Sequence, residues 1–220
     1  MNKIIKDACI LFAITLVAGI VLGAVYNITK GPIAEQNEKA KQTAYREVLS
    51  DADSFEAIDS EKYSEANLAA LVSELKDTEE DFSKDEVTDV VAGVKNGKIV
   101  GFVITVVAGD GYGGDIKFST GISSDGKYMG TSILSISETA GLGMRAKTDP
   151  AFLAQFNGAS VDKFTVVKDG TGSSSEDKID AIGGSTVTSK AVTKGINTAL
   201  AVFKELKSEN VKTVGGASIE

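Results

Sequence analysis

The residues best suited to hold a ligand lie near the C-terminus, in the stretch Asp180-Ala181-Ile182-Gly183-Gly184-Ser185-Thr186-Val187-Thr188-Ser189-Lys190. Two adjacent glycines allow the backbone to turn and to approach a ligand closely. Hydroxyl side chains follow, and then a periodic apolar segment that predicts a helix to about Leu206. Because the first-turn amides of a helix lack intrahelical partners, this arrangement suits a phosphate group. A simple helix cap at Ser185 or Thr186 explains the same residues equally well.

Two further loops rich in small residues occur earlier, Gly109-Asp110-Gly111-Tyr112-Gly113-Gly114 and Ser137-Glu138-Thr139-Ala140-Gly141-Leu142-Gly143-Met144. The first matches the dinucleotide-binding pattern G-x-G-x-x-G, which requires a helix directly after the glycines. Residues 115–120 alternate as a strand does, so we reject that match. This loop is either a flexible connection or a place where the backbone approaches a flat ligand, with Tyr112 as a packing group. The second loop has the composition of a binding loop, with one carboxylate and one hydroxyl.

Composition excludes several kinds of chemistry. The 220 residues contain no histidine, which removes Ser-His-Asp and Cys-His catalysis and the usual zinc and haem ligands. The single cysteine, Cys9, lies in an apolar stretch, so neither a disulfide nor a thiolate metal site can form within the chain. A net charge of −8 argues against binding to nucleic acid, whose phosphates require a basic surface.

The N-terminal region predicts a membrane anchor. Residues from Ala8 to Tyr26 carry no charge and are almost all apolar, and as a helix they span about the 30 Å hydrocarbon layer of a bilayer. A cleavable signal peptide is the alternative, but its apolar run is shorter, about 7–15 residues. Because Lys3 and Lys6 precede the apolar run, we expect a cytoplasmic N-terminus and an extracytoplasmic main domain.

The segment that follows the anchor is polar and acidic. We expect Gly31-Pro32 to break the anchor helix or to start a new one, and residues 34–49 to form a polar helix. A short apolar helix is expected around residues 68–75. The acidic run from Asp77 to Asp81 offers carboxylates to a cation, but such runs are usually solvated, and we assign no metal site to it.

Strand patterns dominate from residue 87 onward. Segments 87–95 and 98–107 flank the dipeptide Asn96-Gly97. Segments 116–123 and 127–135 flank Asp125-Gly126 in the same way. Both dipeptides favour tight hairpin turns. Two hairpins in series predict an antiparallel sheet with helices packed on it, which is an α+β fold.

The C-terminal part supplies the packed helices. Asp149-Pro150 predicts a short helix, and residues 161–167 predict a strand. The core residues of the short helix are expected to be Phe152, Leu153 and Phe156. The final helix carries an apolar face made of Val192, Ile196, Ala199, Leu200, Phe203 and Leu206. If this face packs on the sheet, the start of the helix at residues 186–189 is held on a rigid element, as a ligand site requires.

The stretch from Asp180 to Ser189 resembles the flavinylation motif of the covalent FMN-binding domain family, D-x-x-[ST]-G-A-T-x-[ST]-S. The resemblance implies that Thr186 carries FMN through a phosphoester bond, with Thr188 as the neighbouring alternative. Gly183 stands where the family pattern has Ser or Thr, and Ser185 stands where it has Ala.

The two other loops are similar to segments of the same family. Residues 111–116 resemble its G-Y-x-G-x-I, and residues 138–143 resemble its E-T-P-G-L-G, with Ala140 in place of proline. The resemblance implies that these loops enclose the flavin, and it places the redox chemistry on FMN, with no catalytic residue and no metal. The implied FMN-binding residues are Thr186, Gly183, Gly184, Ser185, Thr188, Ser189, Lys190, Tyr112, Gly113, Glu138, Thr139, Gly141, Leu142 and Gly143.

The resemblance also implies a domain plan. It consists of an anchor at 1–30, a helical acidic membrane-proximal segment at 31–86, the FMN-binding domain at 87–208 and a flexible tail at 209–220. One anchor and one such domain in 220 residues are most similar to the G-subunit family of Rnf ion-translocating ferredoxin:NAD oxidoreductases.

That similarity implies a flavoprotein that transfers electrons within a redox-driven ion translocase. Its implied partners are the other membrane and iron–sulfur subunits and a flavin transferase for maturation. One alternative is a component similar to the C subunit of the sodium-translocating NADH:quinone oxidoreductase. Others are an anchored binding module of the same fold without redox function, and a stand-alone extracellular flavin reductase.

Overall fold

The computed structural model describes residues 2–75 and 81–219, without the side chains of Asn2 and Glu74. The chain divides into two compact units, residues 1–42 and 43–220. Residues 77–80, most of the acidic run for which we expect solvation, lie outside the described residues.

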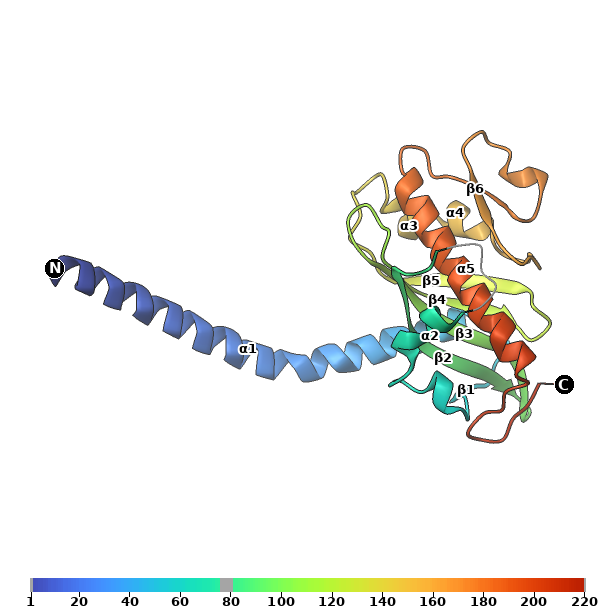
Figure 1. Ribbon diagram of the computed structural model, residues 1–220, viewed down its shortest axis with the longest axis horizontal. Coiled ribbons are helices and arrows are strands. Elements are labelled where there is room, and N and C mark those ends of the chain that lie inside the picture. The colour runs from blue at the N-terminus through green and yellow to red at the C-terminus, as the bar shows by residue number, and fades with distance from the viewer. Residues whose placement is uncertain (1, 76–80, 220) are drawn as a thin grey trace. The chain divides into compact units, whose positions relative to one another are not determined.

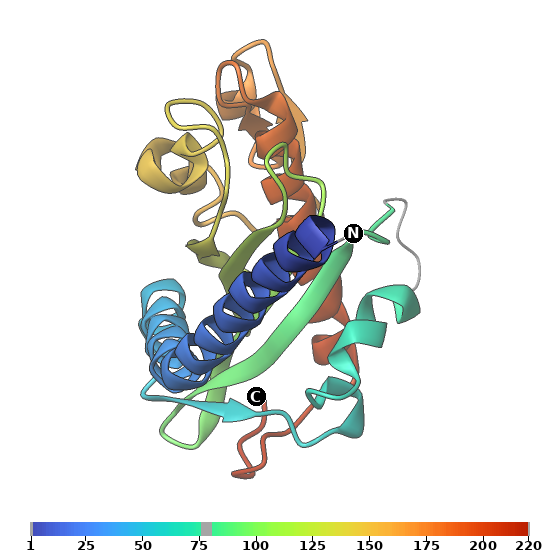
Figure 2. The ribbon, with the colours of Figure 1, turned by 90° about the vertical axis from the view of Figure 1, so that its left-hand side faces the viewer.

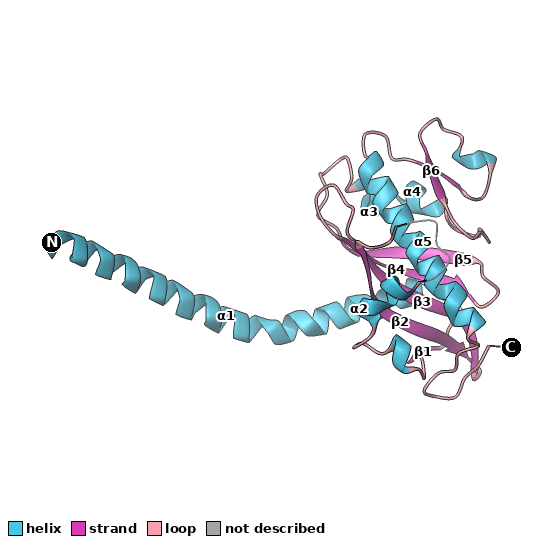
Figure 3. Ribbon diagram, viewed as in Figure 1, coloured by secondary structure: helices cyan, strands magenta, loops and turns pink. Residues whose placement is uncertain are grey.

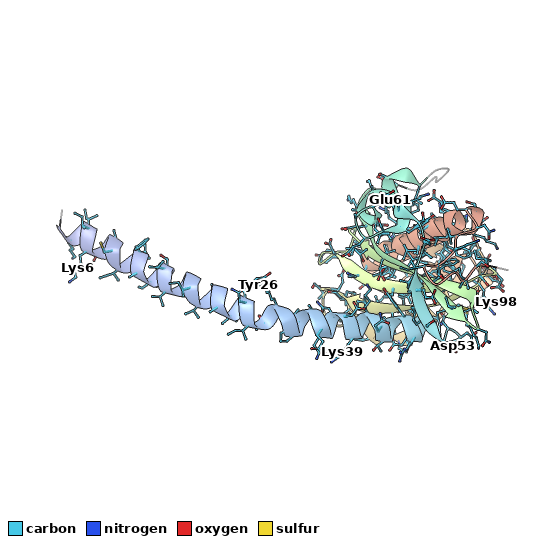
Figure 4. The ribbon with its side chains drawn as sticks, turned by 90° about the horizontal axis from the view of Figure 1, so that it is seen from below. Lys6, Tyr26, Lys39, Asp53, Glu61 and Lys98 are labelled. Atoms are coloured by element: carbon cyan, nitrogen blue, oxygen red, sulfur yellow. The ribbon has the colours of Figure 1, made fainter. Side chains whose placement is uncertain are left out.

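The first unit is helical. It holds most of α1 (Asn2–Val48), whose apolar stretch is long enough and sufficiently free of charge to cross a membrane. The residues of this stretch are exposed, and Figure 4 shows side chains projecting from the helix along its length, with Lys6, Tyr26 and Lys39 as markers. The expected membrane anchor is therefore a continuous helix with an apolar surface.

Gly31 and Pro32 do not end α1, so the predicted break at this dipeptide is wrong. Proline has no amide hydrogen to donate to the carbonyl of Ile28, and the helix loses one hydrogen bond there. A single missing bond bends a long helix without necessarily terminating it. Consistent with this, the axis of α1 bends between Tyr26 and Lys39 (Figure 4).

The second unit is built on an antiparallel sheet. Its described strands are β1 (Ser54–Ala57), β2 (Asp85–Lys95), β3 (Lys98–Ala108), β4 (Ile116–Ser123) and β5 (Tyr128–Ser135). They lie in the order β1-β2-β3-β4-β5, each antiparallel to its neighbours (Figure 1). Sheet and packed helices together confirm the predicted α+β class.

Both predicted hairpins are present. At the β2–β3 turn, Asn96 and Gly97 have φ values of 51° and 75°, the left-handed conformation that a tight primed turn requires. Gly126 has φ 95° at the β4–β5 turn. The short edge strand β1 is not predicted, because its four residues are too few to show an alternating pattern.

One face of the sheet is covered by α5 (Thr186–Ser208), which runs behind the strands in Figure 2. The six apolar residues predicted on its inner face are all buried, which confirms the predicted packing. The close approach of α5 to the sheet depends on Gly195. A Cβ atom there would lie 2.7 Å from the Phe118 ring and 3.1 Å from the Ala108 Cβ. The helix therefore rests directly on β3 and β4.

The opposite face receives residues 43–49, the end of α1 and the residue after it. Three glycines on adjacent strands, Gly93, Gly101 and Gly121, leave room for the chain at Val48 and Leu49. A Cβ atom on Gly121 would lie 2.0 Å from the Val48 carbonyl oxygen, and one on Gly93 would lie 2.4 Å from a Leu49 methyl group. Side chains at these three positions would block the contact between the sheet and residues 48–49.

The smaller elements lie around the sheet. They are η1 (Glu61–Tyr63), α2 (Leu68–Glu74), α3 (Arg145–Thr148), α4 (Pro150–Ala154), η2 (Gly172–Ser174) and the parallel pair β6 (Thr165–Val167) and β7 (Lys178–Asp180). The helix predicted at Asp149-Pro150 is confirmed as α4, and Asp149 caps it by accepting from Ala151 N at 3.1 Å. Phe152 and Phe156 are buried as predicted. Figure 3 shows that the end of this unit around α3, α4 and β6 is mostly loop.

The C-terminal tail departs from the predicted flexibility. Val211 and Ala217 are buried, and the Thr213 hydroxyl donates to a Glu56 carboxylate oxygen. Residue 213 also bridges to Ile58, and residue 218 to Lys98. The tail thus packs beside β1 and is part of the compact unit of residues 43–220. Partners more than a hundred residues away give the tail order that its Gly- and Ser-containing sequence does not reveal.

We predict that Gly121→Ala destabilises the second unit by about 1–3 kcal/mol, because the new methyl group overlaps the Val48 carbonyl. Gly130→Ala is the matched control: it lies opposite Gly121 in the β4–β5 register, and its Cβ would meet nothing closer than 3.8 Å among the described residues. Urea unfolding followed by circular dichroism measures both. Equal stability of the two variants would show that residues 43–49 do not need the glycine surface.

Candidate functional site

The first two small-residue loops are joined directly. The backbone amide of Tyr112 donates to the Glu138 Oε1 atom at 2.8 Å. A Cβ atom on Gly113 would lie 2.1 Å from the carbonyl oxygen of Ser137, so the two backbones touch at this point. Loops separated by more than twenty residues in sequence therefore form one surface.

The third loop, which leads into α5, contacts the second loop. A Cβ atom on Gly143 would lie 2.5 Å from both Glu138 Oε2 and Thr188 Oγ1. Gly184 has φ 78°, which favours glycine, and a Cβ there would lie 3.3 Å from a Leu142 methyl group. The structure thus brings seven of the predicted site residues together: Tyr112, Gly113, Glu138, Leu142, Gly143, Gly184 and Thr188.

Glu138 links the first two loops and does not expose its carboxylate to a ligand. Its side chain is buried, with one carboxylate oxygen bonded to the Tyr112 amide and the other close to Gly143. A buried carboxylate is stable only when hydrogen bonds replace its water. Its position explains why residue 143 is glycine, because a side chain there would displace the carboxylate.

Two residues of the motif shape its turn. The Ser189 hydroxyl is fully buried, accepts from Ile182 N at 2.9 Å and donates to Ser185 O at 2.9 Å. Asp180 accepts from the amide of Gly172 at 3.0 Å. These side chains fix the backbone of the loop, so Ser189 stabilises the predicted site through buried hydrogen bonds.

Gln155 takes part in the same support, although no pattern in the sequence identifies it. Its side-chain amide nitrogen donates to Asp180 O at 3.2 Å, and its oxygen accepts from Asp180 N at 2.8 Å. The amide side chain therefore matches both backbone groups of one residue, as a neighbouring strand does. Its position at the end of α4 and its distance in sequence from the motif give no local signal.

The hydroxyl groups at the start of α5 differ in accessibility. Thr186 is half-buried, whereas Thr188 is 1% exposed. Ser185 is the N-cap residue, yet its side chain makes no capping bond, and among the described residues its buried Oγ atom has no hydrogen-bond partner. The first helical hydrogen bond runs from Ser189 N to Ser185 O. Amides of the first turn therefore have no intrahelical partner and point out of the helix start.

The other predicted site residues lie at the rim. Lys190, Thr139, Gly141 and Gly183 are exposed. The carbonyl oxygen of Thr139 accepts from the amides of Leu142 and Met144, each at 3.1 Å, which closes the second loop into a turn. These residues border the meeting point of the three loops without being fixed by it.

Large apolar side chains are exposed at the same place. Tyr112 and Leu142, on the first two loops, and Val187, in the first turn of α5, are 76%, 46% and 50% exposed. In the described part of the second unit, the other large apolar side chain with comparable exposure is Val214, in the tail. Apolar groups gathered on loops of a water-exposed domain indicate a surface that a ligand or partner covers.

One open cavity lies along the first turns of α5, and a second lies beside the motif that precedes the helix. One, of about 570 Å³, is lined by Asp110, Lys163, Phe164, Thr165, Val166, Val187, Lys190, Ala191, Thr193 and Lys194. The other, of about 770 Å³, lies between the loop at residues 172–176, α4 and the motif at residues 180–183. Both have the size of a small-molecule site, roughly 300–1,000 Å³. No group of three or more His, Cys, Asp or Glu side chains within residues 2–75 and 81–219 could hold a metal.

Asp110 ties the first loop to α5. It accepts from Lys194 and from Lys84, each at 2.7 Å. The Lys194 ammonium, and to a lesser extent that of Lys84, hold the pKa of the Asp110 carboxyl below its ordinary value. The carboxylate therefore stays charged over the physiological range and fixes the loop that carries Tyr112.

Comparisons with known families agree with this geometry. A family model described as an FMN-binding domain matches residues 111–201, which include most of the first loop and all of the second and third. The residues present fit FMN: the helix start suits its phosphate, and the exposed apolar groups suit its flat ring. Fold and site thus define an FMN-binding protein carried by a helix able to anchor it in a membrane. A second model, described as the RnfG N-terminal region, matches residues 1–48.

Relatives cover almost the whole chain. The chain is 36% identical over 203 residues to the G subunit of the Na(+)-translocating ferredoxin:NAD(+) oxidoreductase complex of Acetobacterium woodii, covering 92% of this chain and 93% of the relative. It is 33% identical to the proton-translocating counterpart of Clostridium ljungdahlii, covering 89% and 92%. The chain belongs to the G-subunit family of ion-translocating oxidoreductase complexes.

Solved structures share the fold. The NqrC protein of Shewanella oneidensis superposes with a TM-score of 0.52 at 17% identity, covering 80% of this chain and 99% of that one. The C subunit of the Na(+)-translocating NADH-quinone reductase from Parabacteroides distasonis gives 0.53 at 20% identity, covering 79% and 93%. This likeness bears out the α+β architecture.

We predict that Asp110→Asn lowers stability by about 1 kcal/mol at pH 7, because two charge-assisted hydrogen bonds are weakened. The depressed pKa of the carboxyl means that its contribution is present above the unfolded-state pKa and is lost as the pH falls through the folded-state value. The difference between the two proteins should therefore begin to shrink as the pH falls below about 4.

Urea unfolding across this pH range measures the difference. Asp162→Asn is the control, because Asp162 pairs with Lys204 on an exposed surface and should have little effect. A difference between wild type and Asp110→Asn that stays constant down to pH 3 would contradict the electrostatic explanation.

Proposed function

We propose that this chain is the FMN-carrying electron-transfer subunit of an ion-translocating ferredoxin:NAD oxidoreductase complex. The observation that carries the proposal is the convergence of three loops at the open N-terminus of α5, within the segment that matches the FMN-binding domain. The relatives whose names state this complex cover nearly the full length of the chain. When bound, the flavin accepts and releases electrons, and the protein sets its position and surroundings.

We further propose that Thr186 holds FMN covalently. Thr186 is a half-buried residue at the helix start, whereas the Thr188 side chain is buried against Gly143. In the attachment step, Thr186 Oγ1 forms a bond to the flavin-side phosphorus of a flavin dinucleotide. The pyrophosphate bond of that donor breaks, and the nucleoside monophosphate leaves with the hydroxyl proton. A flavin transferase is the partner that this step requires.

The loops would then surround the flavin. Tyr112, Leu142 and Val187 offer apolar contacts to the ring, and backbone groups around Thr139 and Gly141 offer hydrogen bonds to its edge. Gly183 and Gly184 leave space beside the attachment point, because neither carries a side chain that would fill it. Lys190, exposed one turn into α5, provides positive charge near the phosphate or a reduced anionic flavin.

Membrane and complex partners follow from the family. We propose that α1 crosses the membrane once, with Lys3 and Lys6 on the cytoplasmic side and the FMN-binding unit outside. The other membrane and iron–sulfur subunits of the complex would exchange electrons with the flavin. The exposed apolar groups around the site are consistent with such a partner approaching the cofactor.

The covalent proposal predicts a change in mass. Full-length protein co-expressed with a flavin transferase should be heavier by FMN less one water, and the added mass should survive denaturation. Thr186→Val should abolish the increment because the attacking oxygen is gone. Thr188→Val is the control and should keep it, since that hydroxyl is buried.

Intact-mass spectrometry of the three proteins decides between the assignments. Loss of the increment in Thr188→Val alone would move the attachment to that residue. Wild-type protein without added mass would instead favour an anchored binding module that has the fold but lacks covalent flavin.

The topology predicts which face of the membrane is accessible. In cells whose outer layers have been removed, a protease that does not cross the membrane should digest the unit from residue 43 onward and leave the N-terminus intact. A tag placed before Lys3 reports the protected end, and a cytoplasmic protein serves as the control for lysis. Protection of the FMN-binding unit would reverse the proposed orientation.

A further inference from the structure

We infer that the Ser185 hydroxyl donates a hydrogen bond to the phosphate of the FMN attached at Thr186. This inference rests on the proposed function and assigns a positioning role to a residue that departs from the family pattern. Ser185 is 6% exposed, and its Oγ atom has no hydrogen-bond partner among the residues that the structure describes.

The unpartnered state of this hydroxyl is unusual for a residue in its position. A serine at an N-cap normally accepts from an amide of the first helical turn and so removes one of the open donors. Here that bond is not made, and the backbone carbonyl of Ser185 is engaged by Ser189 N at 3.0 Å and by the Ser189 hydroxyl at 2.9 Å. The backbone is fixed, while the side-chain hydroxyl has no partner among the described residues and the first-turn amides have none within the helix.

No group in the described part of the chain bonds to the hydroxyl at this position. Burying a hydroxyl without a partner lowers stability, so alanine would suit the flavin-free protein better than serine. A ligand oxygen within reach would reverse this preference. The phosphate proposed on Thr186, the next residue in sequence, brings two non-bridging oxygens to the helix start, and both can accept.

The negative charge of the attached phosphate favours hydrogen-bond donors at this position. A phosphodiester carries one negative charge, and the chain as a whole is acidic, with a net charge of −8. Hydrogen bonds to a charged acceptor are about twice as strong as those between neutral groups. The open amides of the α5 start and the Ser185 hydroxyl together supply neutral donors to that anion, so the phosphate is held without requiring a buried cation.

Thr193 provides a matched control on the same helix. Its Oγ1 atom is also buried and also lacks a partner within the described part of the chain, and its side chain is 3% exposed. It lies seven residues beyond Thr186, about 10 Å along the helix axis, out of reach of a phosphate at the first turn. Removing the Thr193 hydroxyl should therefore affect flavin-free and flavinylated protein alike.

The test compares melting temperatures of the full-length protein, made with and without the flavin transferase. Flavin attachment should raise the melting temperature of wild type more than that of Ser185→Ala, by at least about 2–4 °C. Flavin-free Ser185→Ala should melt no lower than wild type. For Thr193→Val, the increase on flavin attachment should equal that of wild type.

The phosphorus NMR signal of the attached FMN gives a second readout that stability alone would not move. Its chemical shift should change in Ser185→Ala and stay constant in Thr193→Val. The intact mass identifies the flavinylated fraction of each variant before the comparison.

The outcomes separate the two proposals. Flavinylated wild type and Ser185→Ala with equal gains in melting temperature and equal phosphorus shifts would overturn the inference about Ser185 and leave the proposed function standing. Wild-type protein that gains no flavin mass would overturn both.

Discussion

The site depends on the close packing of α5 against the sheet. Because Gly195 carries no side chain, the helix can lie directly against Phe118 and Ala108. Burial of the apolar face of α5 stabilises this packing. This contact fixes the direction of the helix and therefore the place where its open amides point. Every group proposed to hold the flavin is positioned relative to that helix start. A looser helix would leave the phosphate end of the ligand without a defined position.

Around this fixed point, glycine is used for close contact between backbones. Gly113 touches the loop before Glu138, and Gly143 leaves room for the Glu138 carboxylate beside Thr188. The consequence is a site made of three loops that hold one another, with few side chains inserted between them. Loops joined in this way keep their shape while their apolar side chains remain free to meet a ligand.

Buried polar groups divide into two kinds. Glu138 and Ser189 are satisfied by backbone groups of neighbouring loops, so they belong to the scaffold. The Ser185 hydroxyl, one helical turn before Ser189, is buried and lacks a partner in the described structure. The hydrogen bonds thus separate Glu138 and Ser189, which hold the loops together, from Ser185, whose hydroxyl takes no part in the scaffold, although all three side chains are polar.

The sequence alone determined what depends on local pattern. The turn dipeptides at residues 96–97 and 125–126 predict the hairpins, helical spacing predicts α5, and the uncharged run from Ala8 predicts the membrane helix. The motif around Thr186 predicts the loop that leads into α5. Tertiary structure decided the rest: the ordered tail beside β1, the Gln155 clamp and the partnerless Ser185 hydroxyl. The first two depend on partners that are distant in sequence. The last depends on burial, and a residue's burial is set by the whole fold rather than by its neighbours in sequence.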